Sequence, residues 1–148
     1  MIPLGIRNNN PGNIRKSSQK WLGKIPQEEP FEFEKFHTMA HGIRALAKVL
    51  LTYYNKHNLR TIEEIISRYA PSSDKNNTKS YIKYVHEETN SCPYTNVIFE
   101  EDMELNEVDN LASLVRIIIN YENGKLSGMK PYIEFSEIVK VVKELLEK

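Results

Sequence analysis

One apolar stretch, from about residue 106 to residue 121, constrains the fold more than any other feature of the chain. Its apolar side chains recur every three or four positions, at Val108, Leu111, Val115, Ile118 and Ile119. This spacing predicts an amphipathic helix with a wide apolar face, and Asn123-Gly124 supplies a stop at its C-terminal end. Such a helix needs neighbours to cover it, so we expect a helix-dominated globular fold.

Glu122 continues the apolar stripe of this helix. It lies four residues after Ile118 and three after Ile119, so its carboxyl is aimed inward. Partial burial and the negative end of the helix dipole both raise the pKa of such a carboxyl. A carboxyl that stays protonated near neutral pH can act as a general acid on a glycosidic oxygen. The alternative is a frayed last turn, with Glu122 in solvent beside Lys125.

Four further helices are predicted, each from a capping residue followed by helical periodicity. Their caps are Thr38, Thr61, Asn77 or Thr78, and Ser136. The first three are expected to end at about Asn55, Tyr69 and Glu88. The last is expected to bury Val139, Val142 and Leu146.

The first thirty-seven residues are dense in turn formers and predict loops and short strands. Residues 31–34 alternate with period two, which predicts a short half-buried strand with Glu32 and Glu34 on its wet face. Residues 92–99 are expected to be irregular or a short strand. Without repeats or a long linker, the chain is predicted to be one domain over residues 1–148, mainly α (α+β), with a small β or irregular region near its N-terminus.

Composition excludes several classes of protein. With 148 residues, 40% of them hydrophobic, and 20 basic residues against 20 acidic ones, the chain has a core and no excess charge. This argues against disorder and against a dedicated nucleic-acid module. Five bases and no acid fall in residues 1–24, however, and six acids and no base in residues 100–109.

Targeting and metal signals are missing from the sequence. No apolar run approaches the roughly 20 residues of a membrane span, and no secretory signal is expected at the N-terminus. The lone Cys92 predicts no internal disulfide and a chain that does not depend on an oxidising compartment. His37 and His41 lack a third ligand, so we expect no metal and no cofactor.

The segment Asn8-Asn9-Asn10-Pro11-Gly12-Asn13 contains more amides than a turn needs. Amide side chains on a rigid loop suit a hydroxyl-rich or N-acetylated ligand, because each can donate and accept a hydrogen bond. The alternative is that these side chains hold the loop together through bonds to its backbone. The pattern leaves both interpretations open.

A family resemblance spans nearly the whole chain. It rests on residues 5–15 (GIRNNNPGNIR), Trp21-x-Gly23, Phe33-x-x-Phe36, residues 42–45 (GIRA), residues 69–71 (YAP), Asn77-Thr78-x-x-Tyr81, residues 121–124 (YENG) and Pro131-Tyr132. In these motifs the chain resembles a family of bacteriophage and prophage virion-associated proteins. That family usually has a glutamate just ahead of the Asn-Thr pair, whereas this chain has residues 72–76 (SSDKN) there.

A second resemblance implies chemistry. Residues 115–124 (VRIIINYENG) resemble the helix of lysozyme-like peptidoglycan-cleaving enzymes, in which an apolar stripe ends in a catalytic glutamate. In those enzymes a turn, a small β region and further helices follow this helix, whereas here the corresponding segments precede it. The resemblance therefore implies a circularly permuted lysozyme-like domain with Glu122 as its catalytic acid.

The activity implied is that of a lytic transglycosylase or muramidase, which cleaves the β-1,4 bond between N-acetylmuramic acid and N-acetylglucosamine. Candidate substrate-binding residues are Asn10, Asn13, Arg15, Thr78, Tyr81 and Tyr121. Arg7 is a further candidate, with Arg15, for meeting carboxylates of the polymer. Transglycosylation needs one glutamate only, whereas hydrolysis is favoured if Glu32, Glu34 or Asp74 faces Glu122.

A non-enzymatic role is the alternative: a virion structural component or a glycan-binding protein. The expected partners are peptidoglycan glycan strands and other virion proteins, without nucleic acid. The expected location is the phage virion, or the bacterial cytoplasm before release.

Overall fold

The computed structural model describes residues 1–74, 76–91, 101–126 and 130–148. In chain order its elements are α1 (Leu4–Arg7), α2 (Met39–Lys56), α3 (Ile62–Tyr69), the 3₁₀ turn η1 (Ser72–Asp74), α4 (Thr78–Asn90), α5 (Val108–Asn123) and α6 (Phe135–Leu146). The mainly α prediction is confirmed. The prediction for residues 92–99 lies outside the described residues.

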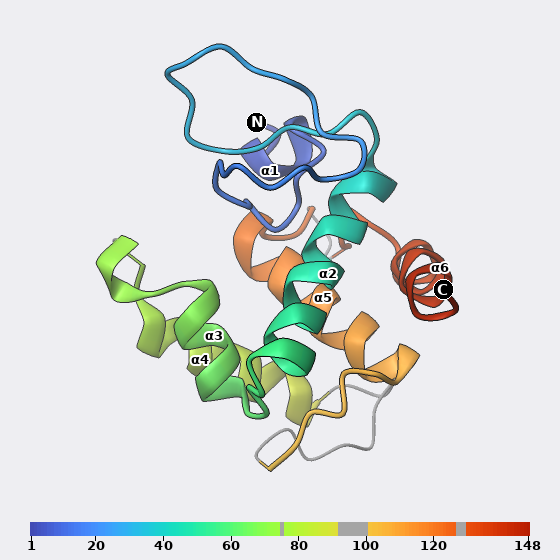
Figure 1. The fold of residues 1–148 in the computed structure, drawn as a ribbon. Helices are drawn as coiled ribbons and strands as arrows, with labels where there is room; N and C mark the ends of the chain where they lie inside the picture. Colours follow the sequence, from blue (N-terminus) through green and yellow to red (C-terminus); the bar gives the residue numbers. More distant parts are fainter. Residues whose placement is uncertain (75, 92–100, 127–129) are drawn as a thin grey trace.

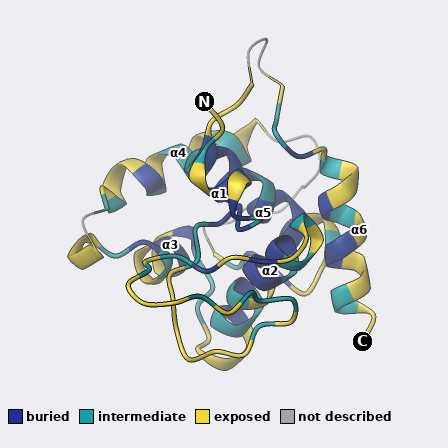
Figure 2. Cartoon of the chain, turned by 90° about the horizontal axis from the view of Figure 1, so that it is seen from above, coloured by how far each residue is buried: buried dark blue, intermediate teal, exposed yellow. Residues whose placement is uncertain are grey.

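Helix α5 is the centre of the fold. It packs against α1, α2, α4 and α6, and α2 crosses in front of it in Figure 1. Most residues of α5 are buried, including Leu111, Val115 and Ile118 of the predicted stripe. In Figure 2 many residues of α2 and α5 are coloured as buried, whereas much of the loop between α1 and α2 is coloured as exposed. The helix with the most buried residues is therefore the one that the others cover. In the described part of the chain, no helix is both long enough and apolar enough to cross a bilayer.

Three of the predicted helix caps are confirmed, because each depends only on chemistry within one turn. The Thr38 hydroxyl accepts from the His41 amide at the start of α2. Thr61 and Glu64 form the reciprocal capping box of α3. The Asn77 side chain accepts from the Ser80 amide and starts α4.

The predicted cap of the last helix is wrong. Helix α6 begins at Phe135 after Glu134, without a side-chain cap, so Ser136 lies inside its first turn. Its buried face consists of Ile138, Val141 and Val142. Val139 and Leu146, expected to be buried, are only partly so. The buried face of α6 is therefore centred about one residue earlier in the helix than the predicted face.

The N-terminal region folds as a short helix and a loop. Helix α1 was not expected from the turn-rich sequence. Over the described residues, β structure is limited to two isolated bridges, Arg15 with Phe33 and Lys24 with Phe36, so the strand predicted over residues 31–34 is wrong. The loop lies over the end of the bundle where α2 begins (Figure 1).

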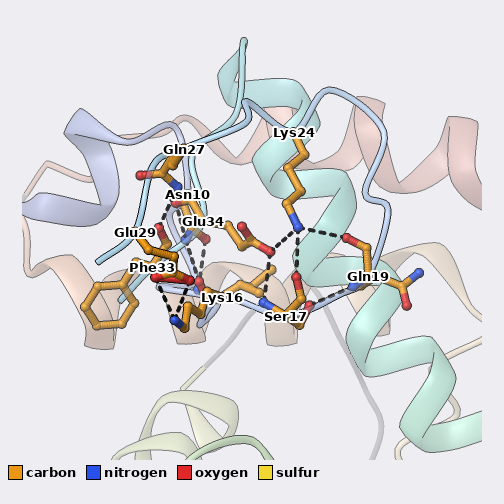
Figure 3. Close-up of polar contacts among 10 residues, drawn as sticks. Asn10, Lys16, Ser17, Gln19, Lys24, Gln27, Glu29, Phe33 and Glu34 are labelled. Carbon is orange, nitrogen blue, oxygen red and sulfur yellow. Dashed lines mark hydrogen bonds and ion pairs between the residues drawn. The ribbon is translucent and has the colours of Figure 1, made fainter. Parts of the chain in front are cut away.

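Glu34 holds this loop together from inside. The prediction that it lies on the wet face of a strand is wrong. Its side chain is 0% exposed, and its Oε2 lies 2.9 Å from Lys24 Nζ and accepts from the Ser17 amide at 3.3 Å. Lys24 Nζ also donates to the carbonyls of Ser17 and Gln19, each at 3.0 Å (Figure 3). A buried ion pair with these additional bonds therefore ties two sides of the loop together. Glu32 is exposed, as predicted.

Candidate functional site

The asparagine-rich loop is held together from within by Asn10. This side chain is completely buried; its Nδ2 donates to the carbonyls of Ile14 and Glu34, each at 3.0 Å, and its Oδ1 accepts from the Ile14 amide at 2.9 Å. Asn10 is therefore a structural residue, and its assignment as a substrate-binding residue is corrected. Asn9 and Asn13 have φ values of 53° and 52°. Asparagine tolerates this left-handed conformation, which accounts for part of the asparagine density.

The same loop is clamped between three helices. Asn123 of α5 donates from Nδ2 to the Pro11 carbonyl at 2.7 Å, and the Tyr69 hydroxyl of α3 donates to the Gly12 carbonyl. On α2, a Cβ added at Gly42 would lie 1.8 Å from the Asn9 carbonyl oxygen, so only glycine allows this approach. The loop therefore presents Asn13 at a fixed position against α5.

Glu122 lies within α5 and is partly buried at this contact. Its Oε1 accepts a hydrogen bond from Asn13 Nδ2 at 2.9 Å. Burial raises the pKa of Glu122; the Asn13 bond, the nearby Tyr81 hydroxyl and the positive charge of Arg15 lower it in part. The Tyr81 hydroxyl lies close enough to lower the pKa of Glu122, but it does not form a hydrogen bond of regular geometry with that carboxyl. The alternative of a frayed helix end with Glu122 in solvent is therefore wrong.

Glu122 lines a pocket of about 320 Å³ between the loop and α3. The lining residues are Gly12, Asn13, Ile14, Arg15, Phe33, Val49, Tyr53, Arg68, Tyr69, Ala70, Pro71, Asp74, Asn76 and Glu122. The pocket therefore brings Asn13 and Arg15 of the N-terminal loop together with Glu122. Burial and the Glu122 charge hold the pKa of the Tyr69 phenol well above its usual value.

The three remaining binding candidates do not line this pocket. Tyr81 is 1% exposed, and its ring stacks on that of Tyr121 with centroids 3.7 Å apart. Tyr81 is therefore too buried to contact a sugar ring, and its assignment as a substrate-binding residue is corrected. Tyr121 is half-buried and does not line the pocket, and its contact with a sugar stays a prediction. The Thr78 hydroxyl donates to the Ala70 carbonyl, and Thr78 lines a second, more open hollow that shares Asn76 with the first.

The three candidate second carboxylates are separated by the fold. Asp74 lines the Glu122 pocket, with its Oδ2 3.8 Å from Arg15 Nε. Glu32 pairs with Arg15 Nη1 at 2.8 Å and does not line the pocket, while Glu34 is buried beside Lys24. Arg7 lies outside the pocket as well, and its Nε donates to the Ile2 carbonyl.

Sequence reasoning missed the contribution of α3 to the pocket. Arg68 and Tyr69 both line it, and the Arg68 guanidinium lies over the Tyr53 ring, 5.2 Å from its centroid. The one sequence signal was the predicted end of a helix at Tyr69, just before Pro71, because the loops that follow such ends often carry functional side chains. Within the ranges that the structure describes, no group of three or more metal-ligating side chains is present.

Comparison with known proteins relates the chain to a bacteriophage protein. No family model matches the chain. It is similar to Protein P5 of Pseudoalteromonas phage PM2, with 37% identity over 123 residues, which cover 81% of this chain and 71% of that protein. The chain therefore belongs to the same family as this bacteriophage protein.

Proposed function

We propose that the protein cleaves the β-1,4 bond between N-acetylmuramic acid and N-acetylglucosamine in peptidoglycan, with Glu122 as general acid. One observation carries the proposal: a carboxyl with a raised pKa lies in the wall of a pocket and is held there by a residue of a rigid loop. Because Asn13 donates to Oε1, the proton of the neutral acid falls to Oε2, from which it can be given to the glycosidic oxygen. The test is clearing of purified peptidoglycan by the wild type and by Glu122→Gln.

The proposed architecture is a circularly permuted lysozyme-like domain. Its support is the sequence resemblance together with the contact between the loop at residues 8–15 and the end of α5. The bond from Asn13 to Glu122 joins residues 109 positions apart, and that from Asn123 to Pro11 joins residues 112 apart. In space, then, the turn adjoins the glutamate helix although it precedes that helix in the chain.

Asp74 favours hydrolysis over transglycosylation. In hydrolysis, Glu122 protonates the glycosidic oxygen, the bond from that oxygen to the muramic anomeric carbon breaks, and a water molecule adds to the carbon and gives up its proton to a carboxylate. Asp74 is the carboxylate in the same pocket. In transglycosylation, Glu122 itself takes the proton of the muramic 6-hydroxyl, and a 1,6-anhydro ring closes.

We predict that mass spectrometry of the wild-type products finds reducing N-acetylmuramic acid ends, heavier by one water than 1,6-anhydro ends. Asp74→Asn is expected to slow their release by about 10²-fold, because the water loses its general base. Glu32→Gln is the matched control, since it removes the other carboxylate of Arg15 outside the pocket. Anhydro ends from the wild type would remove Asp74 from the reaction.

A second prediction concerns pH. The hydrogen bond from Asn13 lowers the pKa of Glu122, so Asn13→Gly is expected to raise it. Activity requires protonated Glu122 and falls as pH rises through this pKa, so the alkaline limb of the rate profile is expected to move to higher pH. Glycine retains the left-handed backbone of residue 13 (φ 52°). An unmoved limb in the profile of kcat/KM would contradict this role of Asn13.

A further inference from the structure

Arg68 is a charged residue of the pocket that has no role in the proposed mechanism. It lines the same pocket as Glu122 and is exposed, and its guanidinium lies over the Tyr53 ring. An arginine stacked on an aromatic ring keeps its donors at the edge of the guanidinium plane, where they can bind a carboxylate in a bidentate manner. The Tyr53 ring, 5.2 Å from the guanidinium, favours this placement of the positive charge through a cation–π contact.

The two arginines of the pocket differ in whether a carboxylate neutralises their charge. Arg15 is paired with Glu32 at 2.8 Å and with Asp74 at 3.8 Å. Across the described residues, in contrast, no carboxylate lies within ion-pair distance of Arg68, and its contact is the neutral ring of Tyr53. Among the described residues, Arg68 is therefore a positive charge without a carboxylate partner in the same pocket as Glu122.

Building on the proposed function, we infer that Arg68 binds a carboxylate of the substrate and makes the pocket selective for anionic glycans. Peptidoglycan carries carboxylates on its lactyl groups and stem peptides, whereas the sugar rings that Glu122 acts on are neutral. Arg68 is then a specificity residue, separate from the catalytic group. Arg68 is not among the groups that shift the pKa of Glu122, so its removal should leave the pH dependence of catalysis in place.

The test compares purified peptidoglycan with the same material after its carboxylates have been converted to amides. The variants are Arg68→Met, which keeps an unbranched side chain, and Arg44→Met as the matched control, because Arg44 lies on α2 outside the pocket and has no part in the proposed site. A charged hydrogen-bonded pair contributes about 1.5–3 kcal/mol, so Arg68→Met is expected to raise KM for native peptidoglycan by about 10- to 100-fold. Its kcat and its alkaline pH limb should stay unchanged.

On amidated peptidoglycan, the wild type and Arg68→Met are expected to act alike. Equal losses for Arg68→Met on both substrates would assign Arg68 a structural role, and no loss on native peptidoglycan would show that it does not meet the substrate; either result overturns the inference. Co-sedimentation with the two insoluble substrates, in the Glu122→Gln background, tests the same preference without turnover. If the wild type cleaves neither substrate, the proposed function fails, while the binding assay still decides the role of Arg68.

Discussion

Glu122→Gln is expected to abolish the clearing of peptidoglycan, with a loss of rate of about 10²- to 10⁴-fold. The glutamine carbonyl can still accept the bond from Asn13 Nδ2, which is 2.9 Å long in the wild type. What the variant lacks is a proton that can be transferred to the leaving oxygen. The measurement is the initial rate of turbidity loss on purified peptidoglycan at matched protein concentrations.

Unfolding will not account for this loss. The pKa of Glu122 is raised in the folded state, mainly by burial, so the stability that this group contributes is fully present below its unfolded pKa and declines as pH rises through the folded value. Glutamine avoids the cost of a buried charge, so Glu122→Gln is expected to be at least as stable as the wild type at neutral pH, and to lose that advantage in acid. Thermal melts at both pH values check this.

Glu32→Gln serves as the matched control for activity, because Glu32 is exposed and outside the pocket. It should clear peptidoglycan at the wild-type rate. Equal clearing by the wild type and Glu122→Gln would remove Glu122 from the mechanism. If no protein clears peptidoglycan, a non-enzymatic role as a virion component or glycan-binding protein becomes the better hypothesis.

The largest expected effect on stability comes from Lys24→Met. This change leaves the carboxylate of Glu34 buried, at 0% exposure, without its positive partner. Breaking a fully buried ion pair typically costs about 3–5 kcal/mol, and because the Lys24 side chain is 22% exposed we expect a loss at the lower end of this range. Lys24 also donates to the carbonyls of Ser17 and Gln19, so two loop contacts are lost with the charge. The measurement is the free energy of unfolding from urea denaturation at pH 7.

Lys16→Met is the matched control, because Lys16 makes an ion pair in the same loop whose two side chains, its own and that of Glu29, are 47% and 59% exposed. An exposed pair of this kind contributes only about 0–1 kcal/mol. The double variant Lys24→Met with Glu34→Leu is expected to lose less stability than Lys24→Met alone, because it removes the unpaired charge. Equal costs for Lys24→Met and Lys16→Met would contradict the structural role of the buried pair.

The helices were predictable because their signals are local. A threonine followed three residues later by glutamate specifies the start of α3 within one turn, and the apolar spacing of α5 specifies its inner face. Where several residues compete within one turn, as at Ser136 and Glu134, the choice depends on how the helix packs. The sequence alone then misplaces the cap and rotates the buried face by one residue.

The candidate site was predictable only in part, since its decisive contacts join distant segments. The inward position of Glu122 follows from helix periodicity. Its bond to Asn13 and the presence of Arg68 in the same pocket follow from the packing of the loop and α3. Likewise, Glu34 is buried because Lys24 lies ten residues earlier on the facing side of the loop, and period-two alternation holds no information about that pairing.

The bond between residues 13 and 122 has a consequence for the order in which the molecule is assembled. During synthesis the loop that carries Asn13 leaves the ribosome well before the end of α5, so the loop is made before its partner helix exists. We expect a contact of such long sequence separation to form after the local helices, because closing a long loop costs more entropy. We therefore expect fragments that end before α5 to lack the pocket, and with it the proposed activity on a glycan.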